Sequence, residues 1–94
     1  MENEMQASTG MPRYVCHKKV WALKIADIEP IVGDGGKATG ATIRPADAGY
    51  GAFEVDGAYM SKHRPEVGGY YVVYDDGYKS FSPAKAFEDG YTRV

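Results

Sequence analysis

The sequence lacks most of the features by which small proteins reveal a compartment or a large partner. It has one cysteine, Cys16, which excludes an internal disulfide framework and suits a reducing compartment. No apolar run approaches the roughly 18 residues that a membrane-spanning helix needs, and the first residues lack the pattern of a secretory signal. Acidic and basic residues are interspersed, with a formal net charge of −2. We therefore expect no membrane association and no binding of long nucleic acids.

Catalytic and metal-binding patterns are also missing. The two histidines, His17 and His63, do not stand at ligand spacing from Cys16 or from each other. Cys16 and His17 are neighbours, so on a strand their side chains point to opposite faces and cannot form a thiolate–imidazole pair. The glycine-dense stretch 33–40 lacks the GxxxxGK[ST] pattern of a phosphate-binding loop, and we interpret it as a flexible surface connection. The sequence predicts no enzyme, no metal site and no cofactor.

The length of 94 residues predicts one small domain of modest stability. Residues 1–10 are polar and without periodicity, and Met11-Pro12 follows them. We expect a disordered N-terminal extension over residues 1–11 and a single β-rich domain over residues 12–94. Met11 is an alternative start.

The N-terminal part of this domain has the pattern of a strand. Trp21, Leu23 and Ile25 alternate with small or polar residues, which predicts a strand within residues 13–28 that has one apolar face. Glu29-Pro30 is expected to end this strand, because proline has no backbone N–H for the ladder.

Shorter elements follow. Residues 41–44 and 53–55 have strand character, separated by residues typical of turns. Asp56 is a candidate N-cap for a short helix over residues 57–63, which Pro65 should stop.

The stretch 69–83 predicts a β-hairpin, but two turns fit it. A two-residue loop at Asp76-Gly77 pairs Tyr74 with Lys79, whereas a three-residue loop at Asp75-Asp76-Gly77 pairs Tyr74 with Tyr78. The choice decides which residues share a face of the hairpin, because side chains alternate along a strand. The sequence leaves both possibilities open.

A second helix is predicted directly after the hairpin. In Ser82-Pro83 the serine suits the N-cap and the proline suits the first helical position of a helix over residues 83–89. Gly90 fits the left-handed residue after the helix, and Tyr91 can fold back onto Phe87. The fold class we expect is α+β and β-rich, with a small antiparallel sheet or partly open barrel and two short helices.

Eight tyrosines stand out in so short a chain. Tyrosine combines a flat apolar ring with a polar tip, which suits protein interfaces, stacking on bases and half-buried sheet surfaces alike. A nucleotide site could use such rings for the base and nearby hydroxyl and cationic groups for phosphate. The candidate ligand-binding residues are Tyr70, Tyr74, Tyr78, Lys79, Ser80 and Lys85, together with His17 and Arg44.

Two resemblances add to this interpretation. The runs Tyr14-Val15-Cys16-His17-Lys18 and Ala22-Leu23-Lys24-Ile25, with the ending from Gly69 to Tyr91, resemble a family of small, functionally uncharacterised proteins of tailed bacteriophages. The ending alone, with Ser82-Pro83 and Phe87-Glu88, is similar to the β module of phage proteins of the Thoeris anti-defence type. Those proteins are oligomeric sponges that bind cyclic nucleotide or cyclic ADP-ribose messengers without cleaving them.

The resemblances imply a phage accessory protein that acts in the host cytoplasm. Our first hypothesis is a homo-oligomer that sequesters a nucleotide-derived immune signal of the host. The alternatives are an inhibitor or adaptor that binds a host protein, as an anti-CRISPR protein does, and a minor component of the virion or its assembly.

Overall fold

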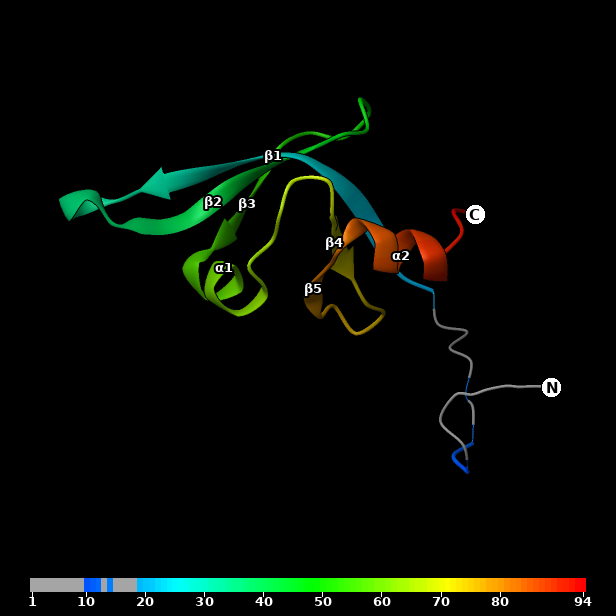
Figure 1. Ribbon diagram of the computed structural model, residues 1–94. Helices are drawn as coiled ribbons and strands as arrows, with labels where there is room; N and C mark the ends of the chain where they lie inside the picture. Colours follow the sequence, from blue (N-terminus) through cyan, green and yellow to red (C-terminus); the bar gives the residue numbers. More distant parts are fainter. Residues whose placement is uncertain (1–9, 13, 15–18) are drawn as a thin grey trace.

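The computed structural model describes residues 10–12, 14 and 19–94 of the chain. Residues 1–9 of the extension predicted over residues 1–11, together with Cys16 and His17, lie outside the described residues. The described residues form five strands, two α-helices and one short 3-10 helix (Figure 1). The elements are β1 (Trp21–Val32), the 3-10 helix η1 (Asp34–Gly36), β2 (Ala38–Pro45), β3 (Phe53–Asp56), α1 (Gly57–His63), β4 (Tyr70–Val73), β5 (Lys79–Ser82) and α2 (Ala84–Gly90).

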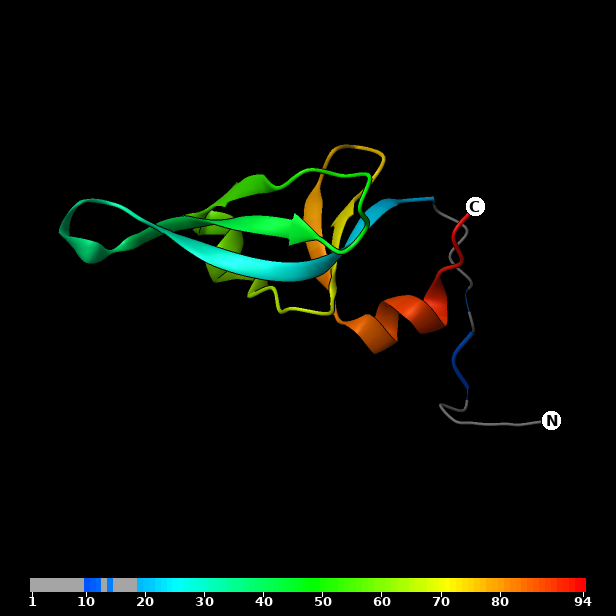
Figure 2. The ribbon, with the colours of Figure 1, turned by 90° about the horizontal axis from the view of Figure 1, so that it is seen from above.

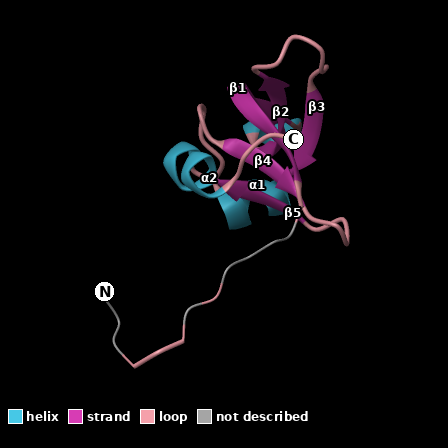
Figure 3. Cartoon of the chain, turned by 90° about the vertical axis from the view of Figure 1, so that its right-hand side faces the viewer, coloured by secondary structure: helices cyan, strands magenta, loops and turns pink. Residues whose placement is uncertain are grey.

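All five strands belong to one antiparallel sheet in the order β3-β2-β1-β4-β5. The first three strands are consecutive neighbours and the fourth returns to lie beside the first, which is a Greek-key arrangement. Seen from the end that carries α2, the strands follow a curve rather than a flat layer (Figure 3). The predicted α+β class with a partly open barrel is confirmed, and this is the architecture of OB-fold domains.

The long strand β1 belongs to both halves of the barrel. Its first residues, from Trp21 to Lys24, pair with β4, and its remaining length from Ile25 pairs with β2. The pairing with β2 shifts between Ile25 and Asp27, where β1 has one extra residue, Ala26. Such a bulge bends a strand and increases its twist, so it lies where the sheet must turn from one partner strand to the other.

The prediction that Pro30 ends the first strand is wrong, because β1 continues to Val32. Pro30 lies opposite Ala41 of β2, and this part of β1 has no partner strand on its other side. A proline without an N–H is tolerated where one edge of the strand is free. The prediction also placed the strand within residues 13–28, but β1 begins only at Trp21. The described residues Lys19 and Val20 precede it.

The ends of β1 and β2 form a two-stranded arm that projects beyond the rest of the molecule (Figure 2). β3 pairs with β2 only from Gly40 to Ile43, so the arm beyond Gly40 has no third strand. The glycine-dense loop predicted over residues 33–40 is shorter than expected, because β2 already begins at Ala38. The strand predicted over residues 41–44 is confirmed within β2.

The core lies inside the curved sheet and is closed by α1. Ile25 and Ile43 are the largest fully buried side chains, and Tyr59 of α1 packs with them. α1 has the predicted bounds and the predicted cap, since Oδ1 of Asp56 accepts a hydrogen bond of 2.8 Å from the backbone N–H of Tyr59. The helix ends at His63, and the next residue, Arg64, is its C-cap with a left-handed φ of 47°.

Trp21 differs from the expectation that it shares the buried face with Ile25. Ile25 is 1% exposed, but the Trp21 side chain is 63% exposed. Trp21 is the first residue of β1, and it does not belong to the group of side chains that pack on the core.

The hairpin β4–β5 has the three-residue loop. Tyr71 lies opposite Phe81 and Val73 opposite Lys79. The backbone N–H of Gly77 donates to the carbonyl of Tyr74 at 2.8 Å, and Gly77 has a φ of 88°. This is the type I turn followed by a glycine bulge. The register places Tyr71 and Phe81 together against the core.

The predicted caps of the second helix are wrong. α2 begins at Ala84, Pro83 occupies the N-cap position without a side-chain cap, and the Ser82 hydroxyl donates instead to the carbonyl of Pro83 at 3.4 Å. Gly90 is the last helical residue and does not have a positive φ. The predicted contact of Tyr91 with Phe87 is confirmed, because their rings stack at 4.6 Å.

We expect Gly77→Ala to lower the free energy of unfolding by about 1–2 kcal/mol, because a Cβ atom is strained at a left-handed φ. Gly49→Ala is the matched control, since Gly49 has no atom within 4 Å of a new Cβ and no positive φ. Urea titration of both variants measures the difference, and equal stabilities would contradict this account of the turn.

Candidate functional site

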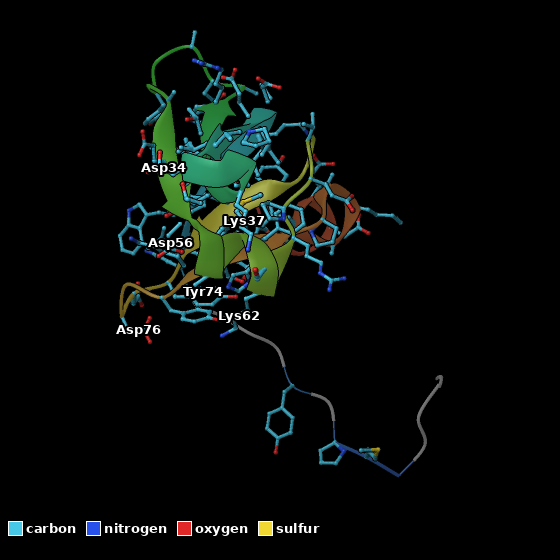
Figure 4. The ribbon with its side chains drawn as sticks, turned by 90° about the vertical axis from the view of Figure 1, so that its left-hand side faces the viewer. Asp34, Lys37, Asp56, Lys62, Tyr74 and Asp76 are labelled. Carbon is cyan, nitrogen blue, oxygen red and sulfur yellow. The ribbon has the colours of Figure 1, made fainter. Side chains whose placement is uncertain are left out.

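The loop of the β4–β5 hairpin and the end of α1 bring four side chains together, which we call the tip cluster: Tyr74, Tyr78, Lys62 and His63. The rings of Tyr74 and Tyr78 are stacked, with centroids 5.7 Å apart and an interplanar angle of 15°. Lys62 Nζ lies 5.1 Å from the centroid of the Tyr78 ring, and the His63 ring lies 5.9 Å from it. Viewed from the arm, Tyr74 and Lys62 lie close together beside Asp76 (Figure 4).

A series of ring contacts connects the tip cluster to the core. His63 contacts Tyr59 at 4.8 Å, Tyr59 contacts Tyr71 at 5.6 Å, and Tyr71 contacts Phe53 at 4.6 Å. The Tyr59 hydroxyl donates a hydrogen bond of 2.6 Å to the carbonyl of Ser80 on β5. Burial raises the pKa of Tyr59 well above its ordinary value, so its hydroxyl remains a donor at neutral pH. These contacts fix the tip cluster to the folded domain.

A second cluster joins α2 to the outer face of the sheet. The ring of Tyr70 stacks on Phe87 with centroids 4.2 Å apart. Glu88 Oε2 accepts from Lys24 Nζ at 2.9 Å and from the Tyr70 hydroxyl at 2.8 Å. The hydrogen bonds from Lys24 and Tyr70 lower the pKa of the Glu88 carboxyl, and the hydrogen bond to Glu88 raises the pKa values of both partners. Tyr70 therefore helps to hold α2 in place.

The structure separates the residues that the sequence suggested as one ligand site. Tyr74 and Tyr78 lie in the tip cluster, whereas Tyr70 contacts α2. Two other candidates form ion pairs elsewhere: Lys85 with Asp89 at 3.0 Å, and Arg44 with Glu29 at 3.3 Å. Ser80 and Lys79 both lie on β5, where the carbonyl of Ser80 accepts a hydrogen bond from Tyr59. His17 lies outside the described residues. Among the candidates that the structure describes, it gathers only Tyr74 and Tyr78 around one point.

A groove of about 410 Å³ lies on the open side of the sheet, between β3 and β5. Its lining residues are Ile31, Thr39, Gly40, Glu54, Val55, Asp56, Tyr59, Tyr71 and Lys79. Of the predicted site residues it contains Lys79 alone. The residues on β3 were missed as site candidates, because their alternating pattern indicates a strand but not which strand lies at the edge of the sheet.

Two kinds of feature matter in the described part of the chain: clusters of metal-ligating side chains and helices that could span a membrane. No group of three or more histidine, cysteine or acidic side chains in residues 10–12, 14 and 19–94 could hold a metal ion. Within the same residues, no helix is long and apolar enough to cross a membrane.

Comparison with known proteins gives a fold but no sequence family. No protein-family model matches the chain, and no curated protein matches it. A solved structure, the NMR solution structure of the monomeric form of the phage L decoration protein, matches with a TM-score of 0.60 and 23% sequence identity. The match covers 92% of this chain.

The fold of this chain is similar to that of the phage L decoration protein. The chain spans 63% of the length of the phage L protein, so the likeness covers part of that protein. The match is consistent with the resemblance to proteins of tailed phages. It provides no support for the resemblance to signal-sequestering sponges.

The Glu88 contacts predict a stability change in acid. Because the pKa of Glu88 in the folded protein lies below its ordinary value of 4.5, its stabilising contribution is present above that value and is lost as the pH falls through the lowered pKa. As the pH is lowered from about 5 to about 3, we expect the Glu88→Gln variant to lose less stability than the wild type loses.

Thermal unfolding at several pH values measures this difference. Glu66→Gln serves as the control, because Glu66 is exposed and makes no ion pair with another described residue. Parallel pH profiles for the wild type and Glu88→Gln would contradict the role assigned to Glu88.

Proposed function

We propose that this chain is a structural component of a tailed-phage particle that attaches to the capsid, as a decoration protein does. The observation that carries the proposal is the fold likeness to the phage L decoration protein over 92% of the chain. This interpretation corresponds to the virion or assembly component among our alternatives, and it is better supported than signal sequestration.

The surface of the domain suits a protein that binds a large partner. Trp21 and Tyr78 are 63% and 41% exposed, and both residue types are enriched at protein interfaces. Tyr78 is held by the ring contacts of the tip cluster, so little side-chain freedom is lost when a partner covers it. A rigid aromatic surface on a small β domain favours attachment to another protein.

Capsid binding predicts that the purified protein co-sediments with heads of the phage whose genome carries its gene. We expect saturable binding that excess unlabelled protein competes away, and we expect mass spectrometry to find the chain in purified particles. Protein that stays in the supernatant while the heads pellet, together with its absence from particles, would refute the proposed function.

Signal sequestration stays a prediction with weaker support, because the candidate residues are divided between separate clusters. We expect calorimetric titration with cyclic nucleotides and cyclic ADP-ribose isomers to show no binding at micromolar concentrations. Binding that Tyr74→Ala abolishes without a change in melting temperature would instead favour sequestration. If this protein instead captures one host protein at equal stoichiometry, that result would favour the hypothesis of an inhibitor or adaptor.

A further inference from the structure

The open side of the barrel presents a free strand edge beside the groove. β3 pairs with β2 on one side only, and β5 pairs only with β4. Glu54, Val55 and Asp56 all line the groove, although successive side chains of a strand point to opposite faces. The groove therefore includes the backbone edge of β3. Ile31, Thr39 and Gly40 also line it, and they extend it across the neighbouring strands β2 and β1.

The two sides of the groove carry opposite charges. Glu54 on β3 and Lys79 on β5 are exposed, and neither makes an ion pair with another described residue. The Asp56 carboxylate is engaged by the backbone N–H of Tyr59. The rings of Tyr59 and Tyr71 add an aromatic surface between these sides. The groove thus offers a negative side, a positive side and aromatic contact area along an unpaired backbone.

We propose that this groove binds an extended segment of a capsid protein, which pairs its backbone with the free edge of β3. This inference rests on the function proposed above and specifies the surface that makes the attachment. An exposed strand edge is a template for another strand, and strand addition is a common way to recognise an extended peptide. The charges at Glu54 and Lys79 favour a segment with a basic residue facing β3 and an acidic residue facing β5.

A second copy of the chain fits this edge less well. Symmetric antiparallel pairing of two β3 strands about Val55 would place Glu54 of one copy opposite Asp56 of the other. Like charges directly opposite one another destabilise a strand pair. The free edge is therefore better matched by a different chain whose charges complement both sides of the groove.

Hydrogen exchange of the protein, alone and bound to purified heads of the phage that encodes it, tests the strand pairing directly. We expect exchange of amides in β3 to slow by at least about tenfold on binding, because new backbone hydrogen bonds protect them. The amides of the arm tip, residues 34–37, provide an internal comparison that should change little.

A charge reversal tests the same surface independently. We expect Glu54→Arg to weaken head binding by about tenfold, with an unchanged melting temperature, because Glu54 is exposed. Glu66→Arg is the matched control, since Glu66 is also an exposed glutamate but does not line the groove.

The outcomes separate the inference from the proposed function. The inference is overturned if the protein binds heads without slower hydrogen exchange in β3. It is also overturned if Glu54→Arg and the wild type bind heads with equal affinity. Both outcomes leave the proposed function standing. Protection of β3 that appears without heads as protein concentration rises identifies a second copy as the occupant and also overturns it. Absence of wild-type binding refutes the proposed function, and the inference fails with it.

Discussion

The pairing of β1 with two different strands is the constraint on which the rest of this structure depends. Residues from Trp21 to Lys24 pair with β4, and the strand from Ile25 onward pairs with β2. The extra residue Ala26 lies at the change of partner. A straight β1 would pair with β2 and β4 along its whole length in a flat sheet. The bulge bends β1 instead, so β2 and β4 pair with different parts of it and the sheet curves. The core inside that curve exists because of this bend.

The same constraint creates both the arm and the free edges. Since β4 leaves β1 after its first residues, the far end of β1 has β2 as its only neighbour and extends with it as a two-stranded arm. The curve brings β3 and β5 to the open side without joining them in the ladder. α1 closes part of this opening, where Tyr59 packs in the core and its hydroxyl binds the carbonyl of Ser80. The groove is the part that remains open.

The tyrosines serve more than one purpose in this arrangement. Tyr59 and Tyr71 belong to the core and to the floor of the groove, Tyr70 holds α2, and Tyr74 and Tyr78 form an aromatic surface at the hairpin tip. A small domain buries only a limited fraction of its surface, so half-buried rings supply stability and contact area together. This explains how a tyrosine-rich hairpin can be structural in one part and available to a partner in another.

Local chemistry in the sequence was enough to predict some elements of this protein. The cap at Asp56, the bounds of α1 and the two possible hairpin turns follow from residues that act on their immediate neighbours. The end of β1, the exposure of Trp21 and the separation of Tyr70 from Tyr74 could not be predicted in this way. The tertiary structure also selected the three-residue turn, because Tyr71 and Phe81 then face the core together. The physical reason is that side-chain facing and free edges depend on pairing between segments far apart in the chain, such as β1 with β4, which no local pattern encodes.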